Sequence, residues 1–110
     1  MKLIICVVSD NKDAHTLLEE LMKKEYRVTK LASTGGFLKK GNTTLLIGVE
    51  QQQVDDVIQV IGNICQSRKQ FITPIPPLPG PAEPFLSYPV EVMVGGAAVF
   101  VVDVEKSVKF

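Results

Sequence analysis

The seven prolines of this 110-residue chain all lie in one stretch, residues 71–89. Proline cannot donate to a β-ladder or continue a helix, so this stretch cannot form a helix or a central strand. Regular structure is therefore confined to the residues on either side. We expect a long proline-rich loop over 68–89. A loop of that length in so small a domain is typical of functional or disordered segments.

The residues before the prolines alternate between strand and helix patterns. The continuous apolar run over 3–8 is rich in β-branched residues, which predicts a central strand buried on both faces. Apolar residues then recur at helical spacing from Leu17 to Met22, after capping side chains at Asp10 and Asn11. The further expected elements are strands over 26–33 and 43–49 and a second helix from 51 or 52 to about 67, with an apolar stripe of Val54, Val57, Ile58, Ile61 and Cys65.

After the prolines, two apolar segments over 90–94 and 97–104 flank the pair Gly95-Gly96. They predict either a hairpin or one strand with a sharp bend. The element order is then βαββαβ with an extra C-terminal strand. This order predicts an α+β, ferredoxin-like fold, in which an antiparallel sheet carries two helices on one face. The other face would need cover, which a homo-oligomer that buries these faces together would supply.

Length and composition favour a single packed domain over 1–110, since 45% of the residues are hydrophobic. The net charge of zero argues against binding a nucleic-acid polymer, which needs many basic side chains facing phosphates. The N-terminal apolar run is too short for a signal peptide, and no stretch approaches the roughly 18 apolar residues of a membrane span. We therefore expect a cytoplasmic protein without membrane association.

Catalytic and metal-binding patterns are poorly represented. His15 is the only histidine, and the spacing of Cys6 and Cys65 fits neither a metal site nor a redox motif. We interpret both cysteines as small core residues. Adjacent carboxylates at Asp55 and Asp56 point in different directions on a helix. We expect no enzyme activity, no metal and no cofactor.

The segment 34–44, Thr-Gly-Gly-Phe-Leu-Lys-Lys-Gly-Asn-Thr-Thr, is the strongest candidate for ligand binding. Its glycines permit close approach of backbone amides, and its lysines could face a phosphate. A polar hairpin loop whose apolar pair folds back onto the core explains the pattern equally well. Arg27 and Thr29 lie two apart on the preceding strand, hence on one face. They suit a phosphate or a base edge, but also an exposed edge strand.

Several segments in the same order resemble the PII-like cyclic di-AMP receptor proteins. They are Arg27–Ala32, Thr34–Leu38, Gly41–Thr44, Gly48-Val49, Tyr88–Val92 and Val94–Ala97. The resemblance covers nearly the whole chain. It implies a homotrimer of ferredoxin-like subunits that binds cyclic di-AMP in clefts between subunits and signals to a downstream protein. It also implies that 34–44 corresponds to the T-loop of PII proteins.

By resemblance, Phe37 and Phe100 would supply apolar surface for adenine, and Arg27 and Thr29 would supply polar contacts. The backbone from Gly36 to Leu38 would read the base edge. The implied ligand-binding residues are Arg27, Thr29, Gly36, Phe37, Leu38, Asn42, Gly48 and Phe100.

Two positions depart from the family pattern. Glu25 stands where relatives often carry asparagine, and a carboxylate repels a dianionic ligand unless it faces away. Lys109 stands where relatives can carry glutamine. The alternative function is a PII-like trimer that senses ATP, ADP or another small anion, with which Lys39 and Lys40 are compatible. An RNA-binding module on this fold would need stacking aromatics on its central strands, which the segments 3–8 and 45–49 lack.

Overall fold

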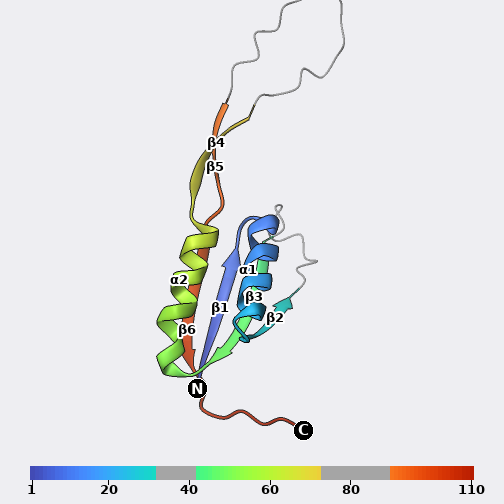
Figure 1. Cartoon of the computed structure of the whole chain (residues 1–110), viewed down its shortest axis with the longest axis vertical. Coiled ribbons are helices and arrows are strands. Elements are labelled where there is room, and N and C mark those ends of the chain that lie inside the picture. The colour runs from blue at the N-terminus through green and yellow to red at the C-terminus, as the bar shows by residue number, and fades with distance from the viewer. Residues whose placement is uncertain (32–41, 73–89) are drawn as a thin grey trace, which may run out of the picture.

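The computed structural model describes residues 1–31, 42–72 and 90–110 (Figure 1). Its elements are β1 (Lys2–Val8), α1 (Asn11–Lys23), β2 (Arg27–Leu31), β3 (Thr43–Val49), the 3₁₀ turn η1 (Gln51–Gln53), α2 (Val54–Cys65), β4 (Arg68–Ile72), β5 (Val90–Val94) and β6 (Ala97–Asp103). The strands and helices expected before the prolines are present, with ends that differ by a few residues.

The main sheet has four strands in the order β2-β3-β1-β6, and each neighbouring pair is antiparallel. Helices α1 and α2 pack side by side against one face of this sheet (Figure 1). Together β1, α1, β2, β3, α2 and β6 supply the βαββαβ order. The fold is therefore the small α+β class expected from the sequence, and its strand order is compatible with a ferredoxin-like domain.

The expected extra C-terminal strand is wrong in its position. Strands β4 and β5 form a separate two-stranded sheet between α2 and β6, which we call the ribbon, and it projects beyond the end of the main sheet (Figure 1). The loop expected over 68–89 therefore begins with a strand. The reason is that β4 ends before the first proline and β5 begins after the last. Neither strand contains a proline, so both can form the hydrogen bonds of a β-ladder.

Strands β5 and β6 do not pair with each other, so of the two alternatives the sharp bend is correct and the hairpin is wrong. The bend needs glycine, because Gly95 and Gly96 have φ angles of 81° and 95°. A Cβ atom on Gly95 would also lie 2.7 Å from the Arg68 guanidinium. The bend is held by the amide of Gly96, which donates to the Cys65 carbonyl at 2.6 Å.

The base of the ribbon is tied to α1 by an ion pair. The guanidinium of Arg68 donates to both carboxylate oxygens of Asp13, at 3.0 and 3.2 Å. Asp13 is buried, and bidentate pairing with arginine satisfies a buried carboxylate. The proximity of Asp13 raises the pKa of Arg68. The first turn of α1 therefore fixes where the ribbon leaves the domain.

The core lies between the main sheet and the two helices. On β1 the buried residues alternate, with Ile4, Cys6 and Val8 facing the helices. The other fully enclosed residues of the core are Leu17, Leu21, Leu45, Ile47 and Val57. Both cysteines are buried in it, as expected, and burial raises the pKa of Cys6 to about 11 and that of Cys65 to about 12. Such thiols are unreactive at neutral pH.

The apolar stripe of α2 differs at one position from the expected one. Val57, Ile61 and Cys65 face the core, but Val60 is buried in place of Ile58, which is 40% exposed. Val60 follows Val57 by three positions, so it lies on the same helix face. The pattern of apolar residues identified the helix, but only the position of the sheet decides which side is covered.

The opposite face of the main sheet has no covering layer among the described residues. On β1, the side chains of Leu3, Ile5 and Val7 point to this face and are only partly buried. The expected burial of β1 on both faces is therefore not met within one chain. Across the strands, three rows form this open face: Leu31, Thr44, Val7, Ala98, then Thr29, Leu46, Ile5, Phe100, and then Arg27, Gly48, Leu3, Val102.

Candidate functional site

The first part of the candidate site is the turn that leads from α1 into β2. The backbone amides of Glu25 and Tyr26 donate to the carbonyls of Met22 and Leu21, each at 3.0 Å. Glu25 has a left-handed backbone, with φ of 67°. This hydrogen-bond pair and this angle define a Schellman motif, the usual way to end a helix. The motif directs the chain so that Glu25, Tyr26 and Arg27 follow one another into the edge of the sheet.

Tyr26 connects the start of β2 to α2. Its hydroxyl donates to Oδ2 of Asp56 at 2.5 Å, and Lys24 Nζ lies 3.4 Å from Oδ1 of the same carboxylate. The hydrogen bond from Tyr26 is the main cause that lowers the pKa of Asp56. It also raises the pKa of Tyr26. These contacts hold the first residues of β2 in place.

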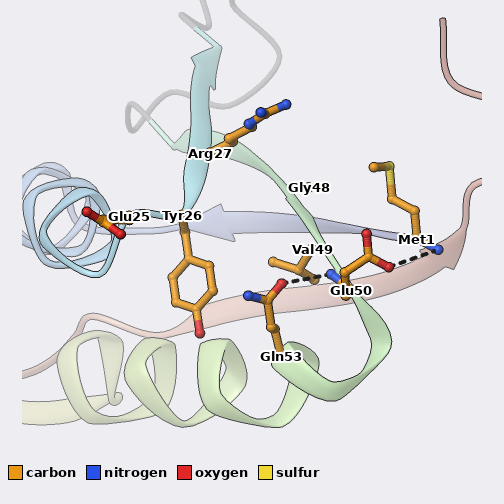
Figure 2. Close-up of a pocket in the computed structure, with 8 residues that line it drawn as sticks. All are labelled: Met1, Glu25, Tyr26, Arg27, Gly48, Val49, Glu50 and Gln53. Carbon is orange, nitrogen blue, oxygen red and sulfur yellow. Dashed lines mark hydrogen bonds and ion pairs between the residues drawn. The ribbon is translucent and has the colours of Figure 1, made fainter.

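A cavity of about 310 Å³ opens beside this turn. It is lined by Met1, Glu25, Tyr26, Arg27, Gly48, Val49, Glu50 and Gln53. Figure 2 shows Tyr26 just before β2 and Arg27 at its first position, with Glu25 on one side of them and Met1 and Glu50 on the other. Two cationic groups, Arg27 and the Met1 amino group, and two carboxylates, Glu25 and Glu50, therefore line one small cavity.

The wall formed by Glu50 is already bonded within the chain. The Glu50 amide donates to Oε1 of Gln53 at 2.9 Å, and the two side chains form a capping box at the start of η1. The amino group of Met1 lies 3.7 Å from Oε2 of Glu50 (Figure 2). Glu50 and Gln53 therefore shape the wall of the cavity with their own polar groups largely satisfied.

The structure brings Arg27 and Gly48 together, as the expected site requires. They are cross-strand partners on β2 and β3, and both line the cavity. A Cβ atom added to Gly48 would meet nothing within 4 Å, so this glycine leaves open space next to the guanidinium. Thr29 lies two residues further along the same face, opposite Leu46. These residues present a cation, a hydroxyl and exposed backbone at one edge of the open face.

Other expected site residues lie far from this edge. Asn42 immediately precedes β3, six residues from Gly48, which is about 20 Å along an extended strand. Phe100 is 56% exposed on β6, at the opposite edge of the sheet. Three strand spacings separate it from β2, or about 14 Å. One chain does not bring Arg27, Asn42 and Phe100 to one point.

The remaining expected residues belong to the segment between β2 and β3 or to the C-terminal segment. Gly36, Phe37 and Leu38 lie outside the described residues, as do Lys39 and Lys40. Lys109 belongs to the segment that follows β6 and is exposed.

Four residues of the cavity were missed by the sequence analysis: Met1, Tyr26, Glu50 and Gln53. Glutamate followed three positions later by glutamine just before a helical pattern was a usable sign of a capping box at Glu50 and Gln53. Nothing comparable marked Met1, which reaches the cavity only because β1 pairs with β3.

Two further findings concern metals and membranes. Within residues 1–31, 42–72 and 90–110, no group of three or more histidine, cysteine, aspartate or glutamate side chains could hold a metal ion. His15 is 70% exposed and pairs with Glu19 on the same helix, at 3.0 Å. None of the helices in this part of the chain has the length and apolarity needed to cross a membrane.

The fold and the cavity together define a class: a small α+β domain with an arginine and an open glycine at a sheet edge, an arrangement that suits an anionic ligand. The comparison with known proteins identifies the family within this class. Residues 1–110 match the family described as the cyclic-di-AMP receptor, and the chain belongs to this family. The resemblance inferred from the sequence motifs is thereby confirmed.

A crystal structure shows the same fold at moderate identity. It is that of a functionally unknown protein from Pediococcus pentosaceus, 38% identical to this chain, with a TM-score of 0.77. The similarity covers 99% of this chain and 96% of the other. The match spans nearly the full length of both proteins, so the domain described above is shared as a whole.

Family membership sets the broad function. The family is one of nucleotide-binding receptors with a signalling role, and cyclic di-AMP is its ligand rather than a cofactor. It is a receptor family and not an enzyme family. Arg27 and Gly48, which line the cavity, offer a guanidinium and exposed backbone, and groups of this kind can bind phosphate.

Proposed function

We propose that this protein binds cyclic di-AMP in clefts between the subunits of a homotrimer and transmits binding through two loops, residues 34–44 and 68–89. The observation that carries the proposal is the separation of the expected ligand residues. Arg27 and Gly48 lie at one edge of the open face, and Phe100 lies at the other, about 14 Å away. Both sets can serve one ligand when the β6 edge of one subunit approaches the β2 edge of the next.

The proposed roles follow from the chemistry of each group. The guanidinium of Arg27 binds a phosphate of the ligand, and the hydroxyl of Thr29 adds a hydrogen bond. The space left by Gly48 admits the ligand close to the backbone of β3. Phe100 of a neighbouring copy would supply apolar surface for one adenine. Gly36, Phe37, Leu38 and Asn42 would complete the site from the segment that joins β2 to β3.

The trimer is supported by the apolar character of the open face. Its residues on β1 and β3 are Leu3, Ile5, Val7 and Leu46, and all of them remain partly exposed in one chain. On β6, Phe100 and Val102 are more than 40% exposed. A contiguous apolar face of this kind marks an interface between proteins. Three copies packed through this face would bury it and place the β6 edge of each near the β2 edge of another.

The proposed signal is a change in the order or position of two segments. Residues 34–44 follow directly after β2, which carries Arg27, and residues 68–89 begin with β4 of the ribbon. A ligand that contacts the first segment favours the conformation in which those contacts form. A downstream protein would then recognise the surface formed by both segments.

Isothermal titration with cyclic di-AMP, cyclic di-GMP and ATP tests the proposal. We expect binding of cyclic di-AMP, at least a ten-fold loss with Arg27→Ala, and little change with Lys30→Ala. Lys30 is the matched control because it lies on the same strand with its side chain on the opposite face. Light scattering after gel filtration should give three times the mass of one chain. Absence of heat with cyclic di-AMP at high protein concentration would refute the proposal, and heat with ATP alone would favour the alternative ligand.

A further inference from the structure

Glu25 occupies a backbone position that suits other residues better. At the left-handed position of a Schellman motif, glycine is usual because a Cβ atom crowds the following carbonyl, and asparagine is tolerated because its short polar side chain can hydrogen-bond locally. Glutamate at φ of 67° therefore costs stability. Residues that are held in such conformations cluster at functional sites. The presence of glutamate at this position is therefore better explained by a function of its side chain than by the geometry of the turn.

The neighbours of Glu25 do not use its carboxylate. Tyr26 and Lys24 both bond to Asp56, and Arg27 points away from Glu25 in the cavity (Figure 2). Within the described parts of the chain, no hydrogen bond or ion pair involves the Glu25 side chain. The carboxylate of Glu50, by contrast, is bonded in the capping box and to Met1. Glu25 is thus an acceptor that the fold leaves available at the rim of the cavity.

The size of the cavity limits what this acceptor can meet. About 310 Å³ is at the lower end of the roughly 300–1,000 Å³ of small-molecule sites. A cavity of this size has room for one nucleobase, with the rest of a cyclic dinucleotide extending toward the neighbouring subunit. Arg27 and Glu25 line the same cavity, so a phosphate bound by Arg27 would place the base of the adjoining nucleoside close to Glu25.

The two purines differ in the edge that they offer to a carboxylate. A carboxylate only accepts hydrogen bonds. Guanine presents two donors side by side, N1–H and the exocyclic N2 amino group, which match the two carboxylate oxygens. Adenine presents one donor, the N6 amino group, next to the lone pair of N1, which a carboxylate oxygen repels. An asparagine side chain, with one donor and one acceptor, matches adenine instead.

We propose that Glu25 is a specificity residue that accepts a guanine at the base nearest Arg27, so that this receptor also binds a mixed cyclic dinucleotide of one adenine and one guanine. The inference rests on the proposed function. It adds that one of the two base positions in the site favours a base that offers hydrogen-bond donors. The ligand preference of this receptor should therefore differ from that of a site with asparagine at this position.

The test is a titration of wild type, Glu25→Asn and Glu25→Gln with cyclic di-AMP, 3′,3′-cyclic GMP-AMP and cyclic di-GMP. Wild type should bind the mixed dinucleotide at least as tightly as cyclic di-AMP. Replacement by asparagine should shift the ratio of the two dissociation constants about ten-fold in favour of cyclic di-AMP, the effect of one charged hydrogen bond. Glu19→Gln, on the exposed side of α1, is the control and should leave the ratio unchanged.

The outcomes separate the two proposals. If no cyclic dinucleotide binds wild type, the proposed function is wrong. If cyclic di-AMP binds but the ratio is the same in wild type and Glu25→Asn, only the role of Glu25 is wrong. Thermal unfolding gives a second readout, because Glu25→Asn and Glu25→Gly relieve the strained backbone and should raise Tm by a few degrees. A fall in Tm would assign Glu25 a role in the fold and overturn the inference.

Discussion

The two faces of the main sheet carry the same kind of residues but have different surroundings. Leu45 and Ile47 point toward the helices and are fully buried, whereas Leu46, between them, points to the open face and is only partly buried. On β1, Ile4 and Ile5 show the same contrast. Both faces are apolar in sequence, yet one chain covers only one of them.

This difference separates what the chain needs to fold from what it needs to function. The helix-covered face holds the core, and of the residues in or packed against that core only Val49 and Tyr26 line the cavity. The open face carries Arg27, Thr29, Gly48 and Phe100, the four described residues of β2, β3 and β6 that the proposed site uses. Substitutions on the helix-covered face should therefore lower the stability of the single chain, whereas substitutions on the open face should weaken association or ligand binding.

The largest effect is expected from Ile47→Ala compared with Leu46→Ala. Ile47 is fully buried against the helices, so its truncation should lower the free energy of unfolding by about 2–5 kcal/mol. Leu46→Ala should cost less in one chain, and its cost should depend on protein concentration because it weakens association. Chemical denaturation at two protein concentrations measures both. Equal, concentration-independent losses would show that the two faces do not differ.

Introducing a charge on the open face tests association directly. Leu46→Glu should abolish the trimer and leave a folded single chain, because the partly exposed side chain can reach water. Gel filtration with light scattering and far-UV circular dichroism give the mass and the secondary structure. Thr44→Glu, on the same face near the end of β3, serves as a milder control. A folded trimer with Leu46→Glu would contradict the assignment of this face.

Gly48→Ala probes the edge of the open face where the cavity lies. No atom within 4 Å obstructs the added methyl group, and alanine restricts the unfolded chain, so stability should rise by about 0.5–1 kcal/mol. Binding of cyclic di-AMP should weaken because the methyl group occupies space beside Arg27. A thermal melt measures the expected gain in stability, and a titration with cyclic di-AMP measures the expected loss of affinity. Weaker stability together with unchanged binding would exclude Gly48 from the site.

The smallest effect concerns the bond that ties the sheet edge to α2. The Tyr26 hydroxyl lowers the pKa of Asp56, so this carboxylate stabilises the fold above its unfolded pKa of about 3.9 and loses the effect as pH falls through the lower folded value. Tyr26→Phe should therefore flatten the decline of Tm below about pH 4. The pKa of Tyr26 is raised, so wild type alone should also lose stability as pH rises above about 10. Identical pH profiles of Tm for wild type and Tyr26→Phe would show that this hydrogen bond does not contribute to stability.

The sequence predicts the helix-covered half of the fold well, because alternation and helical spacing report burial directly. It could not predict that β1 is covered on one side only, since a continuous apolar run is compatible with burial by the same chain or by another copy. The ribbon was missed for a similar reason. β4 contains Arg68, Lys69 and Gln70, whose polar side chains suit a loop as well as a two-stranded sheet in water.

The candidate site was predictable only in part. The pairing of Arg27 with Gly48 follows from a hairpin between neighbouring strands, and motif resemblance pointed to both residues. The cavity walls at Met1 and Glu50 depend on the register of β1 against β3, which no local pattern encodes. The left-handed backbone of Glu25 was hidden as well, because glutamate is not the residue expected at the end of a helix.

The bend at Gly95-Gly96 separates the ribbon from the main sheet, so the ribbon can change in length or sequence while the sheet stays the same. The amide of Ser9 donates to the Gly96 carbonyl at 3.1 Å, so the start of β6 is anchored to the end of β1 independently of what precedes it. On the other side, the chain leaves α2 at the Arg68–Asp13 pair. Insertions or deletions between these two anchors leave the register of the main sheet unchanged. The segment proposed to contact a downstream protein can thus diversify in evolution without altering the sheet edge proposed to bind the ligand.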